Sequence, residues 1–410
     1  MEENYLLQVL DIQLGEGSDL SIVALDAVKA FDRKEWRFSC CNLEALAVLA
    51  QLHRIFTLSS YIRYQCAQWV ESEQPLGPFL ETKNFCVTEA FDWVVWNMFL
   101  KGLYNQVSTM NQTRVTEFIL LGFGNLHSFS ILLFILFLTI FFLTVVGNLL
   151  IIILISTNVR LQTPMYYFLC HLSSCDLVIS TTIVPNMLNA ILLGGKIITF
   201  FECISQLYFY SGTIITECFL LSVMSYDRYL AICNPLRYSS IMDMKYQIYL
   251  SVGPWLMGFT VNLSAVVPIG NFDYCHDNII DHFYCSVLPL QKLSCSDTST
   301  VELEVFLFAL PLFIIPCSFI IVSYVHIFST IMKIPSTTGK HKAFSTCSSH
   351  LTVVGAFYGT LTAKYMIPSK GASMLMNKIV SLLHTVFTPL FNPIIYSLRN
   401  QDIKTSMKLF

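Results

Sequence analysis

Two short runs of polar residues end long apolar segments in this chain of 410 residues. One is Met-Ser-Tyr-Asp-Arg-Tyr-Leu-Ala-Ile-Cys at 224–233, and the other is Pro-Leu-Phe-Asn-Pro-Ile-Ile-Tyr-Ser-Leu-Arg-Asn at 389–400. An ionisable residue at such a place is a candidate functional residue, because charge is costly inside an apolar layer. Asp227 and Arg228 are therefore candidates for a functional pair. The alternative is that Arg228 anchors the end of the helix by extending its charged head to the interface.

The composition indicates a membrane protein. Hydrophobic residues make up 54% of the chain and charged residues only 12%, and the mean hydropathy is +0.60. A soluble domain has about 25% charged residues. A net charge of −3 offers no basic surface for nucleic acid. The apolar residues occur in stretches of about 20, the length that crosses a bilayer core of about 30 Å. We expect an all-α membrane protein with several spans.

The apolar stretches predict seven membrane helices. We place them at about 130–156, 164–190, 203–233, 247–268, 303–330, 344–367 and 376–397. Basic residues gather in one set of connecting loops, which the positive-inside rule assigns to the cytosol. They are Arg160, Arg237, Lys245, Lys333, Lys340, Lys342, Arg399, Lys404 and Lys408. With seven spans, the N-terminus is then outside and the C-terminus is cytosolic. The spans show none of the inverted repeats or acidic rings typical of transporters and channels.

The motifs resemble those of olfactory receptors over residues 110–408. Besides the two runs above, Asn234-Pro-Leu-Arg-Tyr238 and Lys342-Ala-Phe-Ser-Thr-Cys-Ser-Ser-His350 carry this resemblance. It implies a rhodopsin-like bundle in the plasma membrane, surrounded by lipid. It also implies that the chain is a receptor and not an enzyme. Such a receptor binds small hydrophobic odorants and activates a stimulatory G protein, which raises cyclic AMP.

The resemblance also implies an activation switch at the cytosolic ends of the helices. Asp227 would hold Arg228 in the resting state, and Arg228 would contact the G protein in the active state. Tyr324, His350 and Tyr396 would then regroup around Arg228. Pro393 would break the hydrogen-bond ladder of the seventh helix and act as a hinge. The full set is Asp227, Arg228, Tyr229, Tyr324, His350, Asn392, Pro393 and Tyr396.

Buried polar residues predict a second cluster, deeper in the membrane. Glu217 precedes Arg228 by 11 residues, so it lies on the same helix face, about 16 Å deeper. The resemblance groups it with Asn148, Asp176 and Asn392 around a possible sodium ion. The alternative is a pair of buried acids that share a proton, with one of them neutral.

The ligand is expected in the half of the bundle nearer the outside. Helical spacing and the resemblance together predict the lining. The expected wall is formed by Tyr210, Ser211, Ile214, Ile215, Phe308, Leu312, Tyr358, Leu361, Thr362, Tyr365, Leu382 and Thr385. This set suits an uncharged hydrophobic molecule with one hydroxyl or carbonyl. Lys364 is unusual there: we expect it to extend outward, although it would bind a carboxylate if it faced the ligand. His384 is a second departure, and a histidine there would make the receptor sensitive to pH.

Four cysteines fall on the outer side of the predicted topology. Cys203 begins the third span, and Cys275, Cys285 and Cys295 lie in the loop at 269–302. In an oxidising compartment they should pair, and spacing alone allows three connectivities. The resemblance implies the pairs Cys203–Cys285 and Cys275–Cys295.

Residues 1–109 are unlike the remainder of the chain, residues 110–410. The run Ser21–Trp36 resembles the first catalytic motif of LINE-type reverse transcriptases, with Asp26 as the metal ligand. Polymerase chemistry needs further carboxylates to hold two metal ions, and no Asp-Asp motif after an aromatic residue follows. We expect a transposon remnant, disordered and without activity. Met110 resembles the start of an olfactory receptor, and Asn111 begins a glycosylation triplet.

Overall fold

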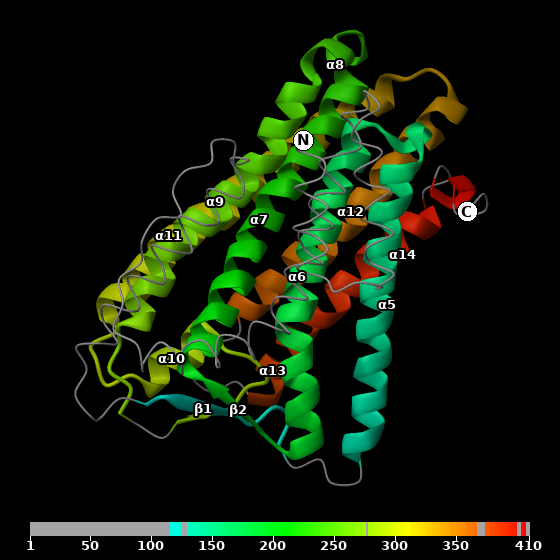
Figure 1. Ribbon diagram of the computed structural model, residues 1–410. Helices are drawn as coiled ribbons and strands as arrows, with labels where there is room; N and C mark the ends of the chain where they lie inside the picture. Colours follow the sequence, from blue (N-terminus) through cyan, green and yellow to red (C-terminus); the bar gives the residue numbers. More distant parts are fainter. Residues whose placement is uncertain (1–114, 125–128, 276–277, 367–373, 400–402, 407–410) are drawn as a thin grey trace, which may run out of the picture.

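The computed structural model of the protein describes residues 115–124, 129–275, 278–366, 374–399 and 403–406. Residues 1–109, Met110 and Asn111 lie outside this part of the chain. Long helices dominate, and α7 runs through the middle with α6 on one side and α9 and α11 on the other (Figure 1). The helices of the bundle are α5 (Ser130–Thr157), α6 (Pro164–Leu193), α7 (Phe200–Cys233), α9 (Met244–Gly270), α11 (Ser299–Lys333), α12 (Thr337–Met366) and a seventh in three parts, α13 (Met374–Leu382), η4 (Leu383–Phe387) and α14 (Thr388–Arg399).

These elements match the seven predicted spans to within a few residues, except that α12 begins seven residues before the predicted 344. Within the described part of the chain, six helices are long and apolar enough to cross a membrane. The helix outside that set is α12, because its serines, threonines and His350 lower its hydropathy. Short elements connect the rest: η3 (Val159–Leu161), α8 (Pro235–Ile241) and α10 (Val287–Leu293).

A small sheet closes one end of the bundle, which we call the sheet end. Its strands are β1 (Glu117–Leu120), β2 (Lys196–Thr199) and β3 (Ile279–Ile280), in the order β2-β1-β3. Strand β1 pairs antiparallel with β2 and parallel with β3. Phe118 of β1 is fully buried and meets the ring of Tyr274 edge to face. The opposite end carries α8 and is called the α8 end (Figure 1).

Local sequence explains where α7 begins and how closely it packs. Thr199 and Glu202 form a capping box, in which each side chain accepts a hydrogen bond from the backbone N–H of the other. Deeper in the bundle, Gly258 of α9 faces the Thr216 hydroxyl and the Gly212 carbonyl of α7. A side chain on Gly258 would overlap both, so glycine allows the two helix backbones to approach each other.

The seventh helix departs from α geometry before Pro393, the residue expected to act as its hinge. The irregular segment is the π-helical η4, whereas Pro393 lies inside the continuous α14. Proline lacks an N–H, so the carbonyl of Pro389, four residues earlier, loses its helical donor. The Asn148 side chain of α5 donates to that carbonyl at 3.1 Å. Its neighbour Gly147 allows this contact, because a side chain there would press on the Pro393 ring.

Candidate functional site

An ion pair lies at the α8 end of α7. Arg228 donates to Asp227 through Nε at 2.9 Å and also through its terminal nitrogen. The Asp227 side chain is fully buried, and that of Arg228 is 15% exposed. The Tyr238 hydroxyl of α8 donates to the other carboxylate oxygen at 2.7 Å. Burial and the charge of Asp227 raise the pKa of the Tyr238 phenol above its usual value. Arg228 is thus held at the border of the bundle by a buried carboxylate.

Tyr229, Tyr324 and His350 lie at the same end of the bundle, whereas Asn392 lies deeper, beside Asp176. The Tyr324 hydroxyl of α11 is hydrogen-bonded to His350 Nδ1 of α12 at 2.7 Å, and His350 is near enough for the charge of Arg228 to act on it. Tyr396 is buried in the main core, and its hydroxyl has no hydrogen-bond partner among the described residues. Tyr229 packs on the apolar cluster of Ile327, Ile331 and Cys347. The structure therefore joins Tyr324 to His350 and keeps Arg228 with Asp227.

A second group of polar side chains lies in the middle of the bundle. Asn392 donates to both oxygens of Asp176, at 2.9 and 3.0 Å. Glu217 is buried and lies close enough to Asp176 for the two charges to interact. Two buried oxygens, Glu217 Oε1 and Asn148 Oδ1, have no hydrogen-bond partner within the described residues. All four residues of the predicted cluster therefore lie inside the bundle, and two of them present oxygens with unused lone pairs.

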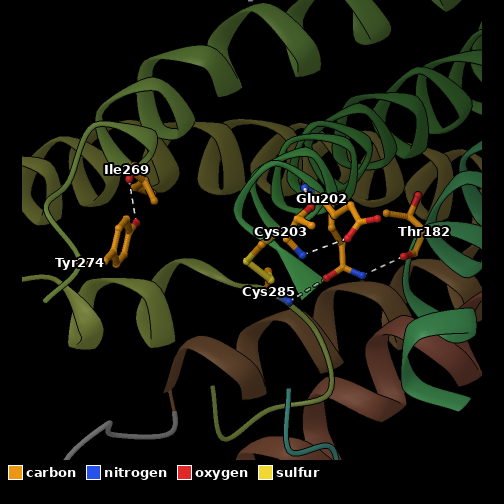
Figure 2. The surroundings of a disulfide bond; sticks show 8 residues. Thr182, Glu202, Cys203, Ile269, Tyr274 and Cys285 are labelled. Carbon is orange, nitrogen blue, oxygen red and sulfur yellow. Dashed lines mark hydrogen bonds between the residues drawn. A yellow bond between two sulfur atoms is a disulfide. The ribbon is translucent and has the colours of Figure 1, made fainter. Parts of the chain in front are cut away.

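Disulfides fix the loop at the sheet end. Cys203 is bonded to Cys285 and Cys275 to Cys295, with Cα–Cα distances of 5.5 and 5.9 Å. These are the pairs that the resemblance implied. Figure 2 shows the first bond, which joins the loop to the start of α7. Gln206 strengthens this junction, because its side chain accepts from the Cys285 N–H and donates to the Thr182 carbonyl of α6, both at 2.8 Å.

Lys364 points into the bundle at this end, so the expectation that it extends outward is wrong. Its Nζ donates to the hydroxyls of Tyr210 on α7 at 2.9 Å and of Tyr284 in the loop at 2.8 Å. The ammonium also lies 5.0 and 5.4 Å from the centroids of these two rings. The reason is that the Cys203–Cys285 bond holds Tyr284 directly beside α7, where its ring meets Tyr210 at 5.1 Å. Two aromatic faces and two hydroxyls thus stabilise the cation.

The loop carries a further ion pair and a neutral histidine. Lys378 of α13 contacts Asp281 at 2.5 Å. His282 is buried beside them, and its Nδ1 accepts from the Phe283 N–H at 3.0 Å. Burial lowers the pKa of His282 to about 3, with smaller contributions from the positive charges of Lys364 and Lys378. His282 is therefore uncharged at neutral pH.

Most residues of the expected ligand wall are buried or half-buried in the bundle, but Ser211 and Phe308 point away from it. Ser211 faces α9, where its hydroxyl donates to Asn262 at 2.8 Å. Phe308 is 51% exposed, because it lies to one side of the buried stripe of α11. The other described wall residues are all buried or half-buried, and they are Tyr210, Ile214, Ile215, Leu312, Tyr358, Leu361, Thr362, Leu382 and Thr385. The side chain of Tyr365 lies outside the described residues.

Sequence reasoning missed several partners. Tyr238 lies inside the motif at 234–238 and Tyr284 lies beside Cys285, but their roles depend on where a short helix and a loop fold back. Phe313, and not Phe308, provides the aromatic contact of α11 with Tyr358, and the two ring centroids are 5.3 Å apart. His384 faces the interior, with Nδ1 3.0 Å from the Thr360 hydroxyl. A tyrosine beside a loop cysteine was the only signal for Tyr284.

Comparison with known proteins identifies the family. Residues 137–410 match the sequence profile of the olfactory receptor family. Olfactory receptor 10A7 of Homo sapiens is 44% identical over 73% of this chain and 94% of its own length. Olfactory receptor 5G9 of Mus musculus is 43% identical over 72% of this chain and 95% of its own length.

A solved structure supports the fold independently of this sequence match. Squid rhodopsin superposes with a TM-score of 0.57 at 16% identity, over 67% of this chain and 78% of that one. The bundle is therefore a rhodopsin-like seven-helix bundle. With a family profile over more than half of its length, the chain belongs to the olfactory receptor family, and it is a multi-pass, G-protein-coupled odorant receptor and not an enzyme.

Proposed function

We propose that the receptor binds a small, largely hydrophobic odorant at the sheet end of the bundle and activates a stimulatory G protein, which raises cyclic AMP. The observation that carries this proposal is the arrangement along α7. Its sheet end presents Tyr210 beside Lys364, and its α8 end presents Arg228 held by Asp227. One helix thus connects a polar and aromatic site with a closed ion pair.

The ion pair explains how the resting state is maintained. While Asp227 holds Arg228, the guanidinium is turned toward a buried carboxylate, and Tyr238 supports the same carboxylate. Release of Arg228 exposes a cation with five N–H donors, suited to the backbone carbonyls at the end of a G-protein helix. Tyr324, His350 and Tyr396 would then regroup around it.

The middle cluster is suited to a sodium ion. Sodium prefers oxygen ligands, and Glu217 Oε1 and Asn148 Oδ1 are buried oxygens without hydrogen-bond partners among the described residues. Asp176 would be the third ligand, oriented by Asn392. The ion would supply positive charge to two acids that otherwise repel each other. A proton shared between Asp176 and Glu217 is the alternative arrangement.

We further propose that the sheet end faces outward at the plasma membrane and that the C-terminus is cytosolic. Disulfides persist in oxidising compartments, and both described disulfides lie at the sheet end. The basic loops lie at the opposite end. In this orientation the glycosylation triplet that begins at Asn111 would lie outside the cell, and we propose Met110 as the working start of the receptor.

The test is a cyclic AMP assay of the full chain and the Arg228→Ala variant in cells, with a stimulatory olfactory-type G protein supplied. We expect the wild type to raise cyclic AMP with an odorant mixture. Arg228→Ala should remove both this response and the basal signal at equal surface density. A variant that signals as the wild type does would show that Arg228 is not the coupling residue. A wild-type signal carried by another second messenger would contradict the stimulatory G protein.

A further inference from the structure

Lys364 lies where three separate elements of the fold meet. The residue itself belongs to α12, Tyr210 belongs to α7, and Tyr284 belongs to the loop that the Cys203–Cys285 bond holds against α7. Both tyrosines are buried, with exposed fractions of 5% and 0%. The position of the Lys364 ammonium therefore depends on three elements of the fold and on one disulfide bond.

The group supplies matched donors for an anion. An ammonium nitrogen is a donor only, and each phenol oxygen that accepts from it still carries a proton of its own. When the phenols rotate, two O–H groups and the ammonium can all point at one acceptor with two oxygens. A carboxylate has that form, and charge-assisted bonds to it are stronger than bonds between neutral groups.

We propose that Lys364, Tyr210 and Tyr284 form the recognition site for a carboxylate group, so that the preferred odorants of this receptor are carboxylic acids in their ionised form. This inference rests on the proposed odorant function and narrows its ligand class. It replaces the expectation of an uncharged ligand, which assumed that Lys364 extends outward.

The surroundings of Lys364 favour a negative ligand over a positive one. The charge of Lys364 acts on the buried His282, whereas the charge of Lys378, which also acts there, is paired with Asp281. An amine placed there would meet a like charge in an environment where water screens poorly. A neutral alcohol would gain only an ordinary hydrogen bond.

The apolar part of the acid has neighbours of the right kind. Tyr210 belongs to the same packed cluster as Ile214, Tyr358 and Leu361. Leu361 lies three residues before Lys364 on α12, so the two share a helix face, and it is buried. An acid with a straight hydrocarbon chain would therefore place its carboxylate at Lys364 and its chain along α7 and α12.

The experiment compares straight-chain acids, alcohols and amines of matched lengths on cells that express the full chain, at neutral pH. On the wild type we expect the acids to be the most potent. Lys364→Met keeps the length of the side chain and removes its charge, and it should raise the half-maximal concentration of the acids about 10- to 100-fold while leaving the alcohols within about threefold. The matched control is Lys196→Met in β2, which should leave both classes unchanged.

Two further variants keep the result interpretable. Lys364→Arg retains the positive charge and should retain most of the response to acids. Tyr284→Phe removes a single hydroxyl and should weaken the acids about 3- to 10-fold more than the alcohols. If Lys364→Met fails to reach the surface, the Tyr284→Phe comparison decides alone.

Three results would overturn the carboxylate site: alcohols as potent as acids on the wild type, an acid response that Lys364→Met leaves unchanged at equal surface density, or no response to any acid. A receptor that answers alcohols but not acids would refute this inference and leave the proposed function intact. The difference in basal cyclic AMP between the wild type and Arg228→Ala tests the proposed function separately.

Discussion

Replacing Asp227 with asparagine tests whether the ion pair at the α8 end holds the receptor in its resting state. Asparagine has nearly the same shape and keeps an oxygen for the Tyr238 hydroxyl, so the main change is the loss of negative charge beside Arg228. A hydrogen bond to a charged group contributes about 1.5–3 kcal/mol, and one between neutral groups about 0.5–1.5 kcal/mol. The substitution should therefore weaken the hold on Arg228 by about 1–1.5 kcal/mol.

This energy converts directly into signalling if the bond exists only in the resting state. A shift of about 1–1.5 kcal/mol changes an equilibrium about 5- to 12-fold. Because Asp227 is fully buried, solvent provides little screening that would reduce the effect. We expect the basal cyclic AMP of Asp227→Asn to rise by about that factor wherever the resting state dominates.

The assay measures basal cyclic AMP against surface density for each variant. Asp243→Asn is the matched control, because Asp243 lies at the same end and only caps α9 through the Tyr246 N–H. Asparagine caps helices about as well as aspartate, so this control should behave as the wild type does. A basal signal of Asp227→Asn equal to that of the wild type, at equal density, would refute the role of the pair as a lock.

Three predictions concern stability, measured as thermal denaturation of purified protein. Gly258→Ala should cost about 1–3 kcal/mol, because the new methyl group overlaps α7. Gly253→Ala is the control, because a methyl group there meets no atom within contact distance, and it should be neutral or stabilising by about 0.5–1 kcal/mol. Asn148→Leu should cost about 1–3 kcal/mol, because it leaves a buried carbonyl of α14 without its donor. The lowered pKa of His282 means that the unfolded chain binds a proton below about pH 6.5 while the folded chain does not. Acidification from about pH 7.5 to about 5.5 should then lower the stability of the wild type by about 1.4 kcal/mol through this residue. His282→Gln should lack this loss, and equal losses in both proteins would contradict the assignment.

The sequence was sufficient for the spans because a run of about 20 apolar residues has one stable arrangement in a bilayer. It was insufficient where partners come from distant segments. Strand β1 has only four residues, and its pairing with β2 and β3 joins segments about 80 to 160 residues apart along the chain. Helical periodicity likewise placed Phe308 in the wall, since it shows which residues share a face and not where that face points. The actual contact falls to Phe313.

The direction of the Lys364 side chain is the clearest case in which a distant segment decides what a local sequence pattern cannot. On an isolated helix a lysine near the end extends toward water, because hydration of the charge dominates. Inside the folded protein, Tyr284 offers a hydroxyl and an aromatic face at the position that the ammonium reaches. That alternative exists only after the Cys203–Cys285 bond has brought the loop across, so no local pattern in α12 could reveal it.

The position of Lys364 on α12 also gives a physical route from ligand to switch. Fourteen residues separate it from His350, which at 1.5 Å per residue is about 21 Å along one continuous helix. At one end α12 is bonded to Tyr210 of α7, and at the other His350 is bonded to Tyr324 of α11, near Arg228. Between them, the Tyr358 hydroxyl reaches the Cys218 carbonyl of α7 at 3.4 Å, a long contact that can act as a pivot. A carboxylate that binds between Lys364 and the two tyrosines lengthens the contacts between them, and we expect this to change the tilt of α12 at that end. A rigid helix must then move His350 at the other, so the hydrogen bond to Tyr324 is the contact that a ligand at Lys364 strains first.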